Sequence, residues 1–179
     1  MELPPFRKPV RQSTNSARSG LQIRRILVPV DFLDATASAL RYAAAFAREY
    51  HAMITLLHVV QPDGSHRRRN VSRERLIDEM IEIGECQLRK LVDVIWGDEI
   101  ATDIVVASGK PYLQIANEAK ETNADMIIMA SHGVVGSWGF FRRSTVAKVI
   151  RHAPCPVLVV PLFERGIVAN SPLEVNSDR

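Results

Sequence analysis

Short apolar runs alternate with amphipathic segments along most of the chain. Five runs are rich in aliphatic residues and end at polar or turn-forming residues, which is typical of strands buried on both faces. Between them, apolar residues recur three and four positions apart, as in helices that cover a sheet. The pattern predicts strands at 23–30, 53–60, 102–108, 124–131 and 154–162, and helices at 35–50, 71–97, 111–123 and 144–153.

This alternation predicts an α/β fold. Parallel strands need a crossover connection, which is usually a helix, so we expect a three-layer sandwich with a five-stranded parallel sheet flanked by four helices. In such sheets ligands bind beyond the carboxyl ends of the strands. The chain segments expected at that edge are Asp31, 59–62, 108–110 and 130–143.

The two ends of the chain differ in composition from the centre. The first 25 residues hold six basic residues and one acidic residue, without the apolar core of a secretory signal. We predict a basic, disordered tail at 1–22, one domain at 23–162 and a polar tail at 163–179.

A transit peptide shares the Arg- and Ser-bearing composition of the first tail but adds an apolar helical stripe. Neither this tail nor the arginine run 67–69 has interleaved aromatic residues, so we do not expect nucleic-acid binding.

Composition excludes several classes of function. No apolar stretch approaches the ~18 residues that cross a membrane, and 46% apolar with 24% charged residues is typical of a globular protein. Cys86 and Cys155 form no CxxC motif, so we expect both to be buried or half-buried thiols in a reducing, cytoplasmic compartment. The five histidines show no HxxxH or HExxH spacing, and no serine or cysteine stands at a spacing that makes a nucleophile–base pair compelling. We therefore predict no metal site and no catalytic residues.

Four blocks of sequence together resemble the universal stress proteins of the UspA type. They are VPVDF (28–32), LLHVV (56–60), DMIIMASHG (125–133) and STVAKVIRHAPCPVLVV (144–160), and the resemblance spans about 22–162. It implies a Rossmann-like parallel α/β domain of the adenine-nucleotide α-hydrolase-like superfamily, usually dimeric. Such proteins act in stress responses by binding and signalling, and some members bind ATP while others do not.

The ATP-binding members carry a glycine pattern after the fourth strand: Gly, two residues, Gly, nine residues, Gly, then Ser or Thr. Here these positions hold Ala130, Gly133, Arg143 and Ser144. Glycine lets backbone N–H groups approach phosphate oxygens without a Cβ in between. Ala130 adds only a methyl group, whereas Arg143 places a long side chain where backbone meets the terminal phosphates. Because arginine also binds phosphate well, two alternatives remain for this phosphate-binding loop, the cradle. Either the arginine side chain blocks it, or the arginine side chains bind phosphate in place of the glycine backbone.

The resemblance also implies roles for residues outside the glycine pattern. Asp31 either binds ribose, adenine or Mg²⁺, or orders the start of the following helix. The backbone of Val59 would meet the adenine edge. Other strand-end residues either line the pocket or belong to the core, and His132 is either a site residue or a structural hydrogen-bonding group. The full candidate set is Pro29, Val30, Asp31, Val59, Met129, Ala130, His132, Gly133, Arg143 and Ser144.

The sequence thus predicts a non-enzymatic stress-response binding or signalling module with a degenerate nucleotide cleft. The alternative is an ATP-binding member with slow hydrolysis, in which arginines replace the glycine contacts and Asp31 holds Mg²⁺. A third option is an interaction protein whose basic tail docks on nucleic acid or on the tail of a transporter. We also expect a homodimer through the last strand, Pro156 to Leu162, because an apolar edge strand needs cover.

Overall fold

The computed structural model describes residues 21–61, 72–131 and 144–161. Its strands are β1 (Arg25–Val30), β2 (Met53–Val60), β3 (Thr102–Ser108), β4 (Met126–Ser131) and β5 (Val157–Pro161). Its helices are α1 (Asp34–Tyr50), α2 (Arg73–Ile95), α3 (Pro111–Glu121) and α5 (Thr145–His152), with a short 3₁₀ helix, η2 (Gly97–Glu99). The predicted tails fall outside these ranges apart from residues 21 and 22, so their state stays a prediction.

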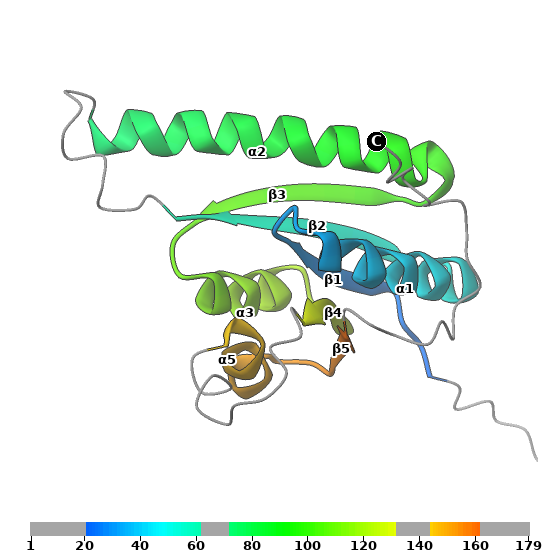
Figure 1. Ribbon diagram of the computed structural model, residues 1–179. Helices are drawn as coiled ribbons and strands as arrows, with labels where there is room; N and C mark the ends of the chain where they lie inside the picture. The colour runs from blue at the N-terminus through cyan, green and yellow to red at the C-terminus, as the bar shows by residue number, and fades with distance from the viewer. Residues whose placement is uncertain (1–20, 62–71, 132–143, 162–179) are drawn as a thin grey trace, which may run out of the picture.

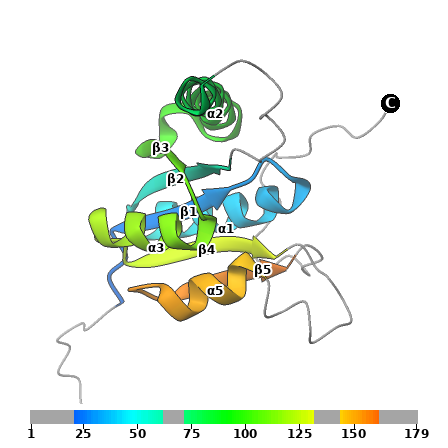
Figure 2. The same ribbon diagram turned by 90° about the vertical axis from the view of Figure 1, so that its left-hand side faces the viewer.

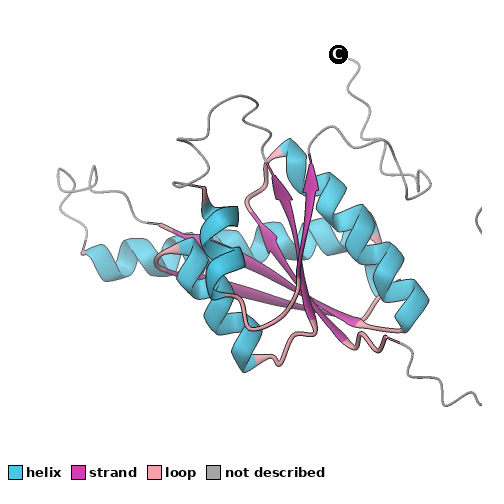
Figure 3. Cartoon of the chain, turned by 90° about the horizontal axis from the view of Figure 1, so that it is seen from below, coloured by secondary structure: helices cyan, strands magenta, loops and turns pink. Residues whose placement is uncertain are grey.

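The five strands form one parallel sheet in the order β3-β2-β1-β4-β5. Helices α1 and α2 cover one face, and α3 and α5 cover the other (Figures 1 and 2). Figure 3 shows the twisted sheet between the two helical layers. The predicted three-layer α/β sandwich is therefore confirmed.

Successive strand residues supply two separate cores, one on each face of the sheet. Ile26, Val28 and Val30 pack under α1 with a row of small helix residues, including Ala39, Ala43 and Ala47. Leu27 points the other way, into the core formed with α3 and α5. Because alanines leave little side-chain thickness, α1 lies close on the sheet, as its sequence predicts.

Helix α2 packs through a narrow face. Among its described residues, Gly84 and Leu88 are the buried ones. A Cβ on Gly84 would lie 3.2 Å from His58 Cδ2 and 3.2 Å from a methyl of Val106, so the helix backbone rests directly on strand side chains. The helix ends at Ile95 with Trp96 as its C-cap, two residues before the predicted end, and Gly97 follows with a φ of +49°.

The two cysteines differ in environment. Cys155 is half-buried, as predicted, and burial, followed by the charge of Asp125, raises the pKa of its thiol. Cys86 is exposed, because it lies on α2 away from the narrow packed face. The expectation that Cys86 is buried or half-buried is therefore wrong.

Candidate functional site

The strand order reverses between β1 and β4, and these two strands pair over a short distance. Their register joins Ile26 to Met126 and Leu27 to Ile127. Beyond that point β1 continues beside β2 as far as Val30, and β4 continues beside β5 as far as Ser131. Ligands of open α/β sheets bind at such a reversal, outside the carboxyl ends of the strands.

The opposite end of this strand pair is held firmly by Asp125. Its Oδ2 accepts hydrogen bonds from the backbone N–H groups of Arg24 (2.7 Å) and Arg25 (3.0 Å), and its own N–H donates to the Arg25 carbonyl (2.9 Å). The strands are thus tied together at their amino ends and continue with other partners at their carboxyl ends.

Asp31 stands at the carboxyl end of β1 and orders the turn into α1. Its Oδ1 accepts hydrogen bonds from the Leu33 N–H (3.1 Å) and from the Thr36 hydroxyl (2.7 Å). The N-cap position of α1 belongs to Leu33, so Asp31 lies two residues before the N-cap. The helix-ordering role considered for Asp31 is therefore present in modified form, as an Asx turn. Asp31 itself is exposed, which leaves a ligand role open.

The remaining strand-end candidates divide by burial. Val30 and Met129 are 4% and 5% exposed, and their side chains lie in the cores on opposite faces of the sheet. A ligand could therefore contact these two residues through their backbone groups. Pro29, Val59 and Ala130 are half-buried. All five lie in the last three residues of a strand.

Ser144 brings the start of α5 to the same end of the sheet. The helix follows β4 and precedes its parallel partner β5, so it runs back along the sheet from the carboxyl ends of the strands. Ser144 is its N-cap residue, and the side chain makes no capping hydrogen bond. The hydroxyl and the first-turn N–H groups therefore suit an anion. His132, Gly133 and Arg143 lie outside the described residues.

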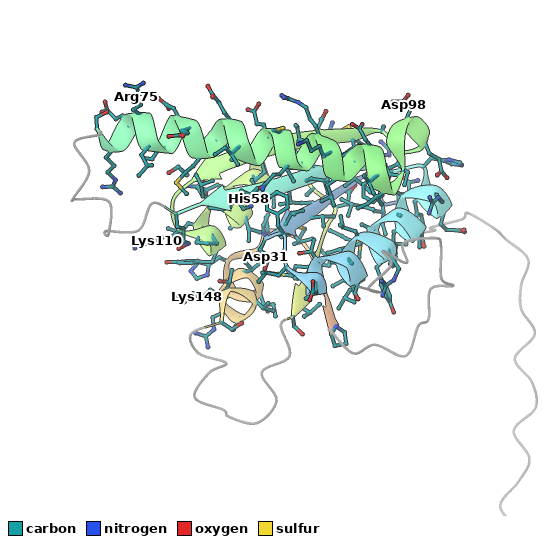
Figure 4. All side chains as sticks on the ribbon, turned by 45° about the horizontal axis from the view of Figure 1, so that its top comes forward. Asp31, His58, Arg75, Asp98, Lys110 and Lys148 are labelled. Atoms are coloured by element: carbon teal, nitrogen blue, oxygen red, sulfur yellow. The ribbon has the colours of Figure 1, made fainter. Side chains whose placement is uncertain are left out.

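Sequence reasoning overlooked one residue beside Asp31. His58 of β2 places Nδ1 2.8 Å from the carbonyl oxygen of Val30, and its ring lies 4.7 Å from that of Phe32. The signal was a lone histidine within an otherwise apolar strand, MITLLHVV. Figure 4 shows His58 between α2 and the end of β1 that carries Asp31.

Comparison with known proteins matches the model of the universal stress protein family to residues 22–161. The chain belongs to the universal stress protein family. Relatives in this family include MJ0531 of Methanocaldococcus jannaschii, 30% identical over 140 residues (76% of this chain and 81% of the relative). Sll1654 of Synechocystis is 27% identical over 159 residues, which cover 87% of this chain and 97% of the relative. The predicted resemblance is thus confirmed.

Solved structures of the family share the fold. A universal stress protein from Archaeoglobus fulgidus is 28% identical with a TM-score of 0.58; the match covers 76% of this chain and 43% of that one. UspA from Lactobacillus plantarum is 24% identical with a TM-score of 0.61, covering 79% and 99%. Two more distant neighbours were solved in complex with nucleotides. The one that holds cAMP is 17% identical with a TM-score of 0.55, over 80% of this chain and 100% of its own. The one that holds dAMP is 21% identical with a TM-score of 0.54, over 78% of this chain and 98% of its own.

Within residues 21–61, 72–131 and 144–161, no three side chains of His, Cys, Asp or Glu gather in a way that suits a metal ion. Over the same residues, every helix is too short or too polar to span a bilayer.

Proposed function

We propose that the protein is a non-enzymatic binding module of the universal stress protein family whose ligand is an adenine nucleotide with a single phosphate. The observation that supports this most is the short β1–β4 pairing at the strand-order reversal, with Asp31, Ala130 and Ser144 all at that end of the sheet. Base and ribose would lie against the ends of β1, β2 and β4. The phosphate would lie toward the start of α5.

Asp31 suits the ribose end of such a ligand. Its carboxylate is exposed, and the hydrogen bonds from Leu33 and Thr36 fix its position without burying it. A carboxylate accepts hydrogen bonds from the two neighbouring hydroxyl groups of a ribose, and charge strengthens each of them. The same group remains able to bind Mg²⁺ in the alternative ATP-binding function.

The phosphate end favours a small ligand. Ser144 and the first turn of α5 supply donors sufficient for one phosphate group. Two of the three glycines of the ATP-binding pattern are replaced, by Ala130 and Arg143, which is why we propose that the terminal phosphates of ATP are disfavoured. The cAMP and dAMP held by two structural neighbours each carry a single phosphate, in line with this proposal.

Isothermal titration calorimetry is expected to show AMP binding at least tenfold more tightly than ATP with Mg²⁺. The reason is that Ala130 and Arg143 replace glycines of the phosphate-binding pattern, which should hinder the additional phosphates that only ATP carries. GMP is the matched control, since it differs from AMP in the base alone. Tighter binding of ATP than of AMP, followed by slow release of phosphate, would establish the alternative function. No heat with any nucleotide at millimolar concentration would rule out the nucleotide proposal altogether.

We further propose that the protein forms a homodimer through β5. This strand is an edge of the sheet, and Val157, Leu158 and Val159 are only half-buried in the single chain. The Ile127 N–H donates to the Pro156 carbonyl (2.9 Å), and in the regular spacing of a parallel ladder the N–H of Val159 then points away from β4. An apolar edge with free donors favours pairing with a second copy.

Val159→Pro is expected to convert the dimer to a monomer while keeping the fold. Proline removes an N–H on the open edge and leaves the β4–β5 ladder intact, which is why edge strands tolerate it. Multi-angle light scattering at micromolar concentration measures the mass, and circular dichroism checks the fold. Val159→Thr keeps the N–H and the branched shape, so it should remain a dimer. A wild-type protein that is already monomeric contradicts the proposal.

A further inference from the structure

We propose that His58 is a positioning residue, which fixes the turn that carries Asp31 and links it to helix α2. The consequence for ligand binding rests on the nucleotide site proposed above. The linkage itself is a property of the free protein. It is carried by three contacts of one imidazole ring: two to the chain on either side of Asp31, where β1 leads into α1, and one to α2.

The first contact is a hydrogen bond to the end of β1. His58 is the register partner of Val30, and its Nδ1 lies 2.8 Å from the Val30 carbonyl oxygen. A carbonyl oxygen only accepts, so Nδ1 carries the hydrogen and donates it. That carbonyl belongs to the peptide group joining Val30 to Asp31. The hydrogen bond therefore fixes the orientation of the peptide that leads directly into Asp31.

The second contact supports a strained residue. Phe32 has a φ of +59°, in the left-handed region that non-glycine residues seldom occupy. Such a backbone persists only where its surroundings hold it, and it is often found at functional sites. The Phe32 ring lies 4.7 Å from the His58 ring, tilted by 50°. His58 thus holds both residues that flank Asp31.

The third contact comes from α2. Gly84 is buried, and a Cβ at this position would lie 3.2 Å from His58 Cδ2, so no side chain separates the helix backbone from the ring. A shift of α2 toward the sheet would therefore press on the imidazole. The same ring then transmits the displacement to Val30 and Phe32.

These contacts leave Asp31 with support from both sides. Its own hydrogen bonds to Leu33 and Thr36 hold the carboxylate from the helix side. His58 holds the strand side, on the sheet face that α1 and α2 cover. Because His58 reaches the ligand through Asp31, its effect on affinity should disappear when the Asp31 carboxylate is removed.

A double-mutant cycle with AMP as the probe tests this. His58→Phe keeps an aromatic ring against Phe32 but removes the donor to Val30, and calorimetry should show at least a fivefold loss of AMP affinity. In an Asp31→Ala background the same substitution should change the affinity less than twofold. His58→Asn places an amide donor near the position of Nδ1 and should recover part of the loss. An equal loss in both backgrounds, or no loss, overturns the proposal.

A second measurement needs no ligand. The Leu33 amide donates to Asp31, so its hydrogen exchange reports the order of the turn. His58→Phe should speed this exchange at least tenfold. Leu88→Ala is the control, because it removes a buried side chain one turn further along α2. It should lower the global stability but leave the local opening of the Asp31 turn, and so the exchange rate of the Leu33 amide, unchanged. Gly84→Ala, which displaces the ring without removing it, should act in the same direction as His58→Phe and serves if that variant fails to fold.

The two measurements separate the two proposals. Faster exchange at Leu33 with no AMP binding in any variant would support the linkage and reject the nucleotide function. AMP binding with unchanged Leu33 exchange and no coupling in the cycle would support the function and reject the role of His58.

Discussion

Replacing Asp31 by asparagine is expected to lower the affinity for AMP roughly ten- to a hundredfold while changing the free energy of unfolding by less than about 0.5 kcal/mol. A hydrogen bond to a charged group contributes about 1.5–3 kcal/mol, which sets the size of the loss. Asparagine keeps the side-chain oxygen that accepts from Leu33 and Thr36, so the turn into α1 persists. Calorimetry measures the affinity, and urea unfolding measures the stability.

Two further variants complete this test. Asp31→Ala removes both the charge and the acceptor, so it should lose affinity and, in addition, about 1 kcal/mol of stability. Asp34→Asn removes another exposed charge three residues later and should leave AMP affinity unchanged. If Asp31→Asn binds AMP as well as the wild type does, Asp31 has only its structural role in the turn.

The elements of the sheet could be predicted wherever local signals agree. Strands β2 and β3 begin and end at the predicted residues, because each is an apolar run bounded by turn-forming residues. The predicted fifth strand was longer than β5, since the run PCP at 154–156 is apolar but its prolines offer no N–H to a ladder. The predicted second helix began slightly early; Ser72 is the N-cap, and its hydroxyl accepts from the Arg75 N–H (3.3 Å).

The candidate site could be predicted only in part. Asp31, Ala130 and Ser144 could be placed at one edge because parallel topology alone brings strand ends and helix starts together. The cluster of His58, Phe32 and Gly84 could not, because its contacts join three segments and depend on register and helix position. Sequence spacing also does not indicate that Phe32 adopts a left-handed backbone conformation.

The phosphate end of the site yields the second large expected effect. Arg143→Gly should raise the affinity for ATP with Mg²⁺ roughly tenfold or more and leave AMP affinity within about twofold. The substitution restores the third glycine of the family pattern and removes the side chain from the position at which, by that pattern, backbone N–H groups would approach the terminal phosphates. A gain of about 1.4 kcal/mol corresponds to this tenfold change. Parallel calorimetric titrations with both ligands measure it.

The neighbouring arginine supplies the control for this substitution. Arg142→Gly removes the same charge from a position where the pattern requires no glycine, so it should produce no gain in ATP affinity. Adding Ala130→Gly to Arg143→Gly should increase the gain further, because it restores the first glycine as well. A loss of ATP affinity in Arg143→Gly would mean that the guanidinium binds phosphate in place of the glycine backbone. A gain of ATP affinity in Arg143→Gly indicates a cradle that the arginine blocks, and a loss indicates one in which the arginine binds phosphate. This one substitution therefore decides between the two alternatives.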